Sequence, residues 1–500
     1  MVVSLPLSKF LLSLSLIVLL INWLIEGGFK TKFRSFFSNR LALLASSLYV
    51  LHLIGAIYSQ HNFGFLMKDL RVKLPMLLLP LIISTSVSIS RATYLVLAKV
   101  FIGSVFIAVF VGYLKYISGY DEAATDFRKL ATFTSHIRLA LLIAFGVGLS
   151  LILAYLNRKL IWLYLSIIVF FIVFLFLLQS ITGIVITAIL GVTVVLYYTF
   201  TQSFKLLSLG IVFLAFCFIS LTGIFIYSKW NKNFNITEIH ELILPEYSSY
   251  GEKYYNDMNR EEVENGNYVW VQVAWNELEE AWSKRSPLSY KGVDQAGQPL
   301  WSTLARYLAS KGFTKDKEGV KLLTDTDIRF IEKGETNYRF AGIQNINKRI
   351  YKILWEIHHF TIGGNPGGNS IAQRFVFWNA AANIFYENPI IGVGTGDTKH
   401  SFNTFYSKSE NPLNAKYWLR AHNQYLTFLL TFGLLGFAWF LVCFLCPLFY
   451  FPKTTLFLPY LLLFATISIS FLTEDTLETQ VGVTIYSLFN SLLLFGSNKN

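Results

Sequence analysis

The chain contains 500 residues, of which 54% are hydrophobic, 17% aromatic and 14% charged, with a mean hydropathy of +0.49. Soluble globular chains are about 45–50% apolar and about 25% charged, so the composition excludes an ordinary soluble protein, a disordered chain and a disulfide scaffold. The net charge of +12 does not indicate a nucleic-acid partner, because the long polar stretch 228–421 is nearly neutral and the excess positive charge flanks apolar segments.

Apolar segments long enough to cross a bilayer recur along the chain, since a span needs about 20 mostly apolar residues in a helix. The sequence predicts an all-α, polytopic integral membrane protein with about 11 transmembrane helices. The predicted spans lie near residues 10–25, 41–59, 74–90, 94–114, 137–156, 160–178, 181–200, 204–227, 424–450, 455–473 and 480–496.

The charges of the connections predict the orientation. With the N-terminus outside, the inner connections carry a net charge of +10 and the outer ones +1, as the positive-inside rule requires. We therefore expect a membrane domain of about eight helices over residues 1–227, an external domain over 228–421 and a membrane domain of about three helices over 422–500. The C-terminus is expected on the cytoplasmic side.

The external stretch of roughly 190 residues is too long for a simple loop, and apolar residues at helical spacing predict a large, mostly helical domain. Helices are expected over Tyr268–Trp282, Asp325–Glu332, Asn345–His359 and Ala372–Tyr386. The last of these runs into a glycine-dense turn that ends at Asp397, where the backbone can approach a ligand closely.

Three features around this turn could bind a lipid-linked phosphate at the membrane surface. Arg374 begins the helix before the turn, Gly392, Gly394 and Gly396 lie in it, and His422 opens the next span. Arginine binds phosphate with a fixed charge and bidentate geometry, and histidine can accept a proton near neutral pH. A dinucleotide-binding loop is disfavoured because the glycines follow a helix and a proline instead of a strand. By contrast, Arg71 and Lys73 beside Pro75 are expected to be interface anchors.

The same residues resemble the C-terminal signature of the O-antigen ligase and polymerase superfamily. The stretches that carry this resemblance are Arg374-Phe-Val-Phe-Trp, Asn388-Pro-Ile-Ile-Gly-Val-Gly-Thr-Gly-Asp, His422-Asn-Gln-Tyr-Leu and Phe432-Gly-Leu-Leu-Gly436. Further stretches are similar to Bacteroidetes-type members, namely Asn22–Gly27, Trp282–Ser286, Ala305–Gly312, Lys315–Gly319 and Glu474–Gln480.

The resemblance implies an inverting glycosyltransferase of the GT-C-like class in the bacterial inner membrane. Such enzymes pass a glycan from undecaprenyl diphosphate to an acceptor on the periplasmic side, without a metal or another cofactor, and the acceptor of ligases is a hydroxyl of the lipid A core. Arg374 would bind the donor diphosphate and His422 would orient or deprotonate the acceptor. Membrane lipids are the remaining expected partner.

A second arginine of many relatives is not matched, because Ser180-Ile181-Thr182-Gly183 carries isoleucine at that place. Arg138 or Arg420 could substitute for it. An O-antigen polymerase and a protein O-oligosaccharyltransferase share the donor chemistry, so the sequence leaves both open. A lipid or polysaccharide transporter is disfavoured, because the spans contain few ionisable residues and the chain shows no internal repeat.

Overall fold

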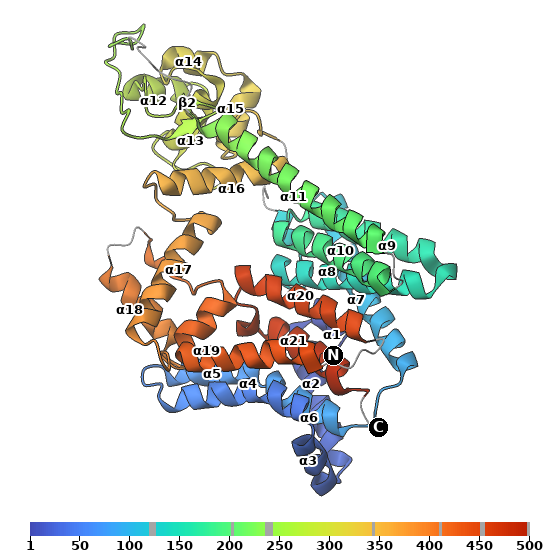
Figure 1. Ribbon diagram of the computed structural model, residues 1–500. Coiled ribbons are helices and arrows are strands. Elements are labelled where there is room, and N and C mark those ends of the chain that lie inside the picture. Colours follow the sequence, from blue (N-terminus) through green and yellow to red (C-terminus); the bar gives the residue numbers. More distant parts are fainter. Residues whose placement is uncertain are drawn as a thin grey trace. The chain divides into compact units, whose positions relative to one another are not determined.

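The computed structural model describes residues 1–119, 127–201, 205–235, 244–342, 346–409, 413–450 and 456–497, and the protein is mostly helical (Figure 1). It divides into two compact units. Unit 1 comprises Met1–Tyr120, Phe127–Ile211 and Gln373–Asn500, and unit 2 comprises Asp121–Asp126 and Val212–Ala372. The predicted boundaries at 228 and 421 concern the side of the membrane, and they remain predictions.

Within the described residues, seven helices are long and apolar enough to cross a membrane. An eighth span results if α2 (Lys9–Ile25) and α3 (Phe29–Ser38), which are bent by 116° at their junction, count as one. The protein is therefore a multi-pass membrane protein, but the predicted count of 11 is not confirmed. The seven helices are Arg40–Ile57 (α4), Arg91–Ile117 (α7), His136–Leu156 (α8), Arg158–Leu177 (which contains α9, Ile161–Leu177), Ile181–Thr201 (α10), Leu206–Phe234 (within α11, Lys205–Phe234) and Gln424–Tyr450 (α19).

Three of the predicted spans form shorter apolar helices. Two of them, α20 (Phe457–Thr473) and α21 (Gln480–Phe495), have 17 and 16 residues. The predicted span 74–90 is only α6 (Pro75–Thr85), whose 11 residues extend about 16 Å at 1.5 Å per residue. That length is about half of the hydrocarbon core, so α6 cannot cross it alone.

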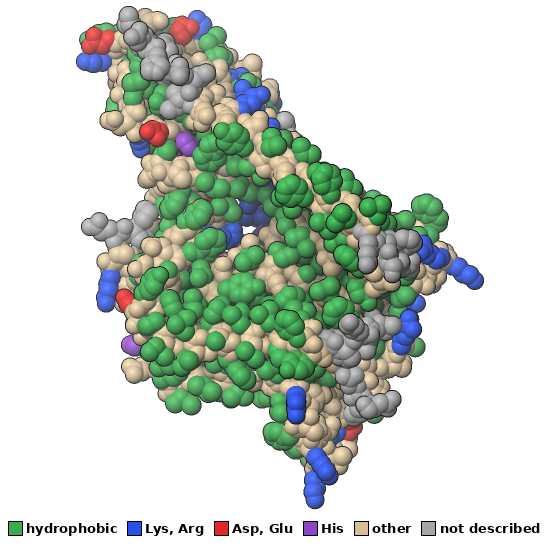
Figure 2. Space-filling model, in the orientation of Figure 1, with side chains coloured by type: hydrophobic (Ala, Val, Ile, Leu, Met, Phe, Trp, Pro, Cys, Tyr) green, Lys and Arg blue, Asp and Glu red, His purple; other side chains and the backbone are tan. Residues whose placement is uncertain are grey.

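Helix α8 is the centre of unit 1. It packs against α7, α9, α10 and α20 (Figure 1), and 83% of the residues in its apolar 18-residue stretch are buried. Sixteen of its residues are buried, Arg138 among them. By contrast, hydrophobic side chains cover the outer surface of the membrane helices (Figure 2), as expected where lipid is the solvent. A charged side chain buried on such a central helix requires partners.

The first part of unit 1 also contributes short helices to the site. After α1 (Ser4–Leu7), the bent pair and α4, helix α5 (Phe63–Lys73) leads into α6, and both lie close to the C-terminal helix α21. In the C-terminal part, α17 (Ser370–Glu387) and α18 (Thr398–Lys408) precede α19. A 3₁₀ turn, η4 (Thr476–Glu478), connects α20 to α21.

Unit 2 is a small helical domain with a two-stranded hairpin. Strands β1 (Val263–Glu264) and β2 (Asn267–Tyr268) pair antiparallel, with Val263 opposite Tyr268. Four helices pack around buried residues that include Trp282, Leu304 and Tyr307. They are α12 (Trp275–Ser283), α13 (Leu300–Lys311), α14 (Lys317–Lys321) and α15 (Asp325–Glu332). Helix α16 (Ile346–Thr361) contributes Tyr351 and Leu354 to a separate cluster with Phe234 and Val263.

Most of the predicted helices of this stretch are confirmed, at Asp325–Glu332, at Ile346–Thr361 and at Ser370–Glu387. The helix predicted over Tyr268–Trp282 is wrong in its first half. There the backbone of Val273 exchanges two hydrogen bonds with Tyr255, and Lys315 bonds the carbonyl of Gln272. Because these partners are distant in sequence, local apolar spacing could not reveal that the backbone groups are used in extended pairing.

Candidate functional site

In unit 1, the buried carboxylate of Glu474 lies close to the side chains of Arg374, His422 and Arg138. It follows α20 directly and its side chain is 6% exposed. Arg374 on α17 donates from Nη2 to Glu474 Oε1 at 3.0 Å and to the Thr473 carbonyl at 3.2 Å. Arg138 on α8 donates from Nη1 to Glu474 Oε2 at 3.2 Å. His422 Nδ1 lies 3.7 Å from the same oxygen. We call these four residues the Glu474 cluster.

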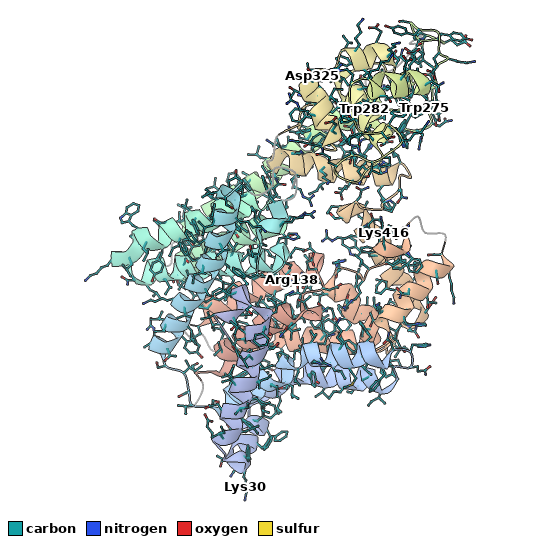
Figure 3. All side chains as sticks on the ribbon, turned by 180° about the vertical axis from the view of Figure 1, so that it is seen from behind. Lys30, Arg138, Trp275, Trp282, Asp325 and Lys416 are labelled. Atoms are coloured by element: carbon teal, nitrogen blue, oxygen red, sulfur yellow. The ribbon has the colours of Figure 1, made fainter. Side chains whose placement is uncertain are left out.

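Arg138 reaches the cluster from the first turn of α8, where Ser135 caps the helix. Figure 3 shows the labelled residue between the teal ribbon of the central helices and the orange ribbon of the C-terminal ones. Its Nη2 also donates to the Asp475 carbonyl at 3.5 Å and its Nε to the Thr479 hydroxyl at 3.4 Å. The guanidinium is thus held by one loop, residues 474–479, which α20 and α21 position.

The backbone at His422 is turned into the left-handed region, with φ of 48°. Such a φ is uncommon for a residue other than glycine and persists only where surrounding contacts hold it. Here the His422 and Asn423 amides donate to the Asp475 carboxylate at 3.0 and 3.2 Å, and the Thr427 hydroxyl donates to it at 2.6 Å. Asp475 thereby holds the backbone just before α19, whose first turn is capped by Asn423 Oδ1, the acceptor of the Leu426 amide at 3.1 Å.

The two neighbouring carboxylates differ in their electrostatics. Burial opposes the charge of Glu474, but the interaction with His422 and the charges of Arg138 and Arg374 outweigh it, so the pKa of Glu474 lies below its ordinary value. For Asp475, burial dominates over its contacts with Thr427 and His422 and raises the pKa. Glu474 is therefore the stable anion of the cluster.

Arg374 retains unused hydrogen-bonding capacity. Its Nε is buried and has no hydrogen-bond partner among the described residues. A guanidinium offers five donors in a planar fork, and a buried donor left unpaired costs about 1–3 kcal/mol. An oxyanion that reaches this side of Arg374 would satisfy the free Nε.

A second group of charges lies beside the cluster. Lys73 at the end of α5 has a side chain that is 3% exposed, and its Nζ contacts Asp69 Oδ2 at 2.5 Å and Glu478 Oε2 at 2.8 Å. Arg420 Nη1 contacts the same Glu478 oxygen at 2.8 Å. We call Asp69, Lys73, Arg420 and Glu478 the Lys73 network. The expectation that Lys73 is an interface anchor is wrong, because the packing of α5 against η4 and α21 removes it from solvent.

The glycine loop after α17 packs against a break in α19. At Gly433 the helix adopts φ of 63° and ψ of −167°. On one side of the break, the Val393 and Gly394 amides donate to the carbonyls of Leu430 and Thr431 at 3.0 and 2.9 Å.

On the other side, the Leu434 amide donates to the Pro389 carbonyl at 2.8 Å and the Leu435 amide to the Ile390 carbonyl at 3.2 Å. The loop therefore satisfies backbone groups that the broken helix cannot pair, which a helix in a bilayer requires.

Glycine is needed in this loop because other backbone lies very close. A Cβ at Gly392 would meet the Thr431 carbonyl oxygen at 2.4 Å, and one at Gly394 the Gly55 carbonyl oxygen at 2.7 Å, both at positive φ. A Cβ at Gly396 would lie 3.0 Å from Ser59. These contacts give the three glycines a packing role, and the predicted contact with a ligand remains a prediction.

The structure thus brings Arg374, His422 and Arg138 together, while Arg420 belongs to the adjacent network. Sequence reasoning gave no site role to the acids that organise both groups, Glu474 and Glu478, although the stretch Glu474–Gln480 was among those that carry the family resemblance. Among the described residues, no three His, Cys, Asp or Glu side chains converge as a metal site requires.

Fold and site together define a multi-pass α-helical membrane protein that holds two arginines and a histidine on one buried carboxylate at the ends of its helices. Residues 336–441 match the family model described as O-antigen ligase. This match supports the O-antigen ligase superfamily, as the sequence motifs predicted. No curated protein matches the chain.

The matched residues include Arg374, the glycine loop and His422, whereas Arg138 and Glu474 lie outside them. The match supports a function like that of O-antigen ligases and polymerases, in the biosynthesis of surface polysaccharides, with a lipid-linked glycan and an acceptor as partners. The narrower resemblance to Bacteroidetes-type members remains a prediction.

Proposed function

We propose that the protein is an inner-membrane glycosyltransferase of the O-antigen ligase type. It transfers a glycan from undecaprenyl diphosphate to a hydroxyl of the lipid A core at the periplasmic surface. The observation that carries this proposal is the convergence of Arg138, Arg374 and His422 on Glu474 in a chain that matches the O-antigen ligase family model.

Arg374 and Arg138 are suited to bind the donor diphosphate. Both are held in place by Glu474 and by backbone carbonyls, so they are ordered before a ligand arrives. A diphosphate oxygen would accept a hydrogen bond from the unpaired Nε of Arg374, and other oxygens would compete with Glu474 for the remaining N–H donors. Arginine charge then stabilises the leaving group, which is the task that a metal ion performs in other phosphoryl-leaving reactions. Arg138 thus serves as the second arginine that the Ser180–Gly183 segment lacks.

His422 is suited to act on the acceptor. A carboxylate beside Nδ1 favours the tautomer with the proton on that nitrogen, which leaves Nε2 to accept one. The acceptor oxygen attacks the anomeric carbon while its proton passes to Nε2. The bond from that carbon to the diphosphate oxygen breaks, and undecaprenyl diphosphate leaves with the bonding electrons. Attack opposite the leaving group inverts the anomeric configuration.

The acceptor is tested with purified protein and undecaprenyl-diphosphate glycan, offered lipid A core, a second lipid-linked glycan or an acceptor protein. Glycan on the lipid A core is expected. A lengthened lipid-linked chain would mean a polymerase, and a glycosylated protein an O-oligosaccharyltransferase, and either result in place of the first would overturn the ligase assignment. A thiol introduced at Ser283 should be labelled from the periplasm and one at Ser35 from the cytoplasm.

A further inference from the structure

A cavity in unit 1 lies at the far end of the membrane helices from the Glu474 cluster. It has a volume of about 220 Å³ and is lined mainly by apolar side chains of α7, α8, α10, α20 and α21, such as Leu149, Leu153, Phe489 and Leu493. Helix α8 connects the two places, because Arg138 lies in its first turn and Leu156 at its end lines the cavity. The 18 residues between them span about 27 Å, close to the thickness of the hydrocarbon core.

The cavity is apolar and large enough for part of a hydrocarbon chain. An engineered cavity of about 150 Å³ lined by Leu, Ile and Phe stays dry and binds benzene. The Tyr94 hydroxyl at the wall is already used, because it donates to the Leu492 carbonyl at 2.5 Å. The interior can therefore hold the methylene groups of a hydrocarbon chain, but it offers few hydrogen-bond partners to a polar solute.

The mouth of the cavity is positively charged. Arg91, the first residue of α7, lines it with an exposed side chain and makes no ion pair or hydrogen bond with any described residue. At the end of α8, Arg158 lies 5.1 Å over the ring of Tyr155, which stacks at 3.9 Å on Tyr198 of the cavity wall. Guanidinium groups bind phosphate in bidentate fashion, and aromatic rings at this depth are typical of the membrane interface.

From this arrangement we infer a binding site for one anionic phospholipid of the leaflet opposite to the catalytic face. One acyl chain occupies the cavity between α7, α8 and α21, and the phosphate lies against Arg91. The predicted orientation places this site in the cytoplasmic leaflet, where the excess positive charge of the chain lies. The site requires only that the protein spans the membrane, so it does not depend on the proposed glycosyl transfer.

Native mass spectrometry of the protein, released from nanodiscs of phosphatidylglycerol and phosphatidylcholine, tests this site. The wild type should retain one phospholipid, and phosphatidylglycerol should be preferred. Ala98→Phe, which fills the cavity, should lose the lipid, while Val96→Phe on the exposed side of α7 should keep it. Arg91→Gln should weaken the preference about fivefold, as expected for one cation at an anionic surface, and the matched Arg34→Gln should not.

Labelling of the wild type supplies a readout that does not depend on the folding of a variant. A phosphatidylglycerol with a photoactivatable group on its acyl chain should label peptides at the start of α7 and the end of α8. Equal labelling of all lipid-facing helices would overturn the inference. So would retention of the lipid by Ala98→Phe, or equal retention of both phospholipids by the wild type.

Discussion

The closure of the α19 break by the glycine loop predicts a specific cost for Gly392→Ala. A Cβ there would lie 2.4 Å from the Thr431 carbonyl carbon and oxygen, so the loop or the helix must move. The left-handed φ of 70° costs a non-glycine residue about 1–2 kcal/mol, and overpacking adds about 1–3 kcal/mol. The total is about 2–5 kcal/mol, before any loss of the hydrogen bonds from Val393 and Gly394.

Gly27→Ala is the matched control, because Gly27 also has a positive φ, of 60°, but a Cβ would meet nothing within 4 Å. It should therefore show the backbone cost alone. The assay is the temperature at which half of the purified, detergent-solubilised protein aggregates. We expect the midpoint of Gly392→Ala to fall several degrees below that of Gly27→Ala.

Equal midpoints for the two variants would refute the claim that the loop closes the break. If Gly392→Ala were as stable as the control but failed to bind the donor, the glycine would be a ligand contact, as the sequence first suggested. The two roles of the loop are thereby separated in one experiment.

Three further predictions concern the buried charges. Glu474→Gln should lower the free energy of unfolding by up to about 3–5 kcal/mol, the cost of removing one partner of a buried ion pair. It should also reduce the affinity for the donor. An unchanged free energy of unfolding would show that Glu474 does not hold the arginines. Because its pKa is lowered, Glu474 adds stability above its unfolded pKa of about 4.3 and loses it as the pH falls through the folded value. The difference in free energy of unfolding between the wild type and Glu474→Gln should thus be constant from pH 8 to 5 and shrink only at more acidic pH. A difference that vanishes by pH 6 would contradict this. Lys73→Met should destabilise by about 3–5 kcal/mol, and Asp69→Asn in the same chain should restore most of it; a double variant as unstable as Lys73→Met would contradict the pairing.

The sequence predicted the membrane class well because apolar length is a local property. The segments that became α4, α7, α8 and α19 were recognisable from residue type alone. The break at Gly433 was not, although Phe432-Gly was noted as a motif. It depends on a partner loop about 40 residues earlier, whose backbone groups complete those of the helix.

The site divides in the same way. Arg374 and His422 were predicted because each lies in a short sequence motif that can be read from neighbouring residues. Arg138 was one of two alternatives for the arginine that the sequence lacks at its usual place. The choice between Arg138 and Arg420 required the positions of Glu474 and Glu478. These two acids are four residues apart, and the direction of the connecting turn decides which arginine joins which acid. Pairing across more than 300 residues, as between Arg138 and Glu474, leaves no trace in local spacing.

The central claim is that the Glu474 cluster transfers a glycan from the lipid-linked donor. It is tested most directly by a single-turnover assay with purified protein, which follows release of undecaprenyl diphosphate together with glycosylation of the acceptor. The account predicts stoichiometric formation of both products by the wild type and by the surface controls Arg71→Ala and His400→Ala, and no measurable formation by Arg374→Ala or His422→Ala in correctly inserted protein. Transfer at wild-type rate by both of the latter variants would contradict it.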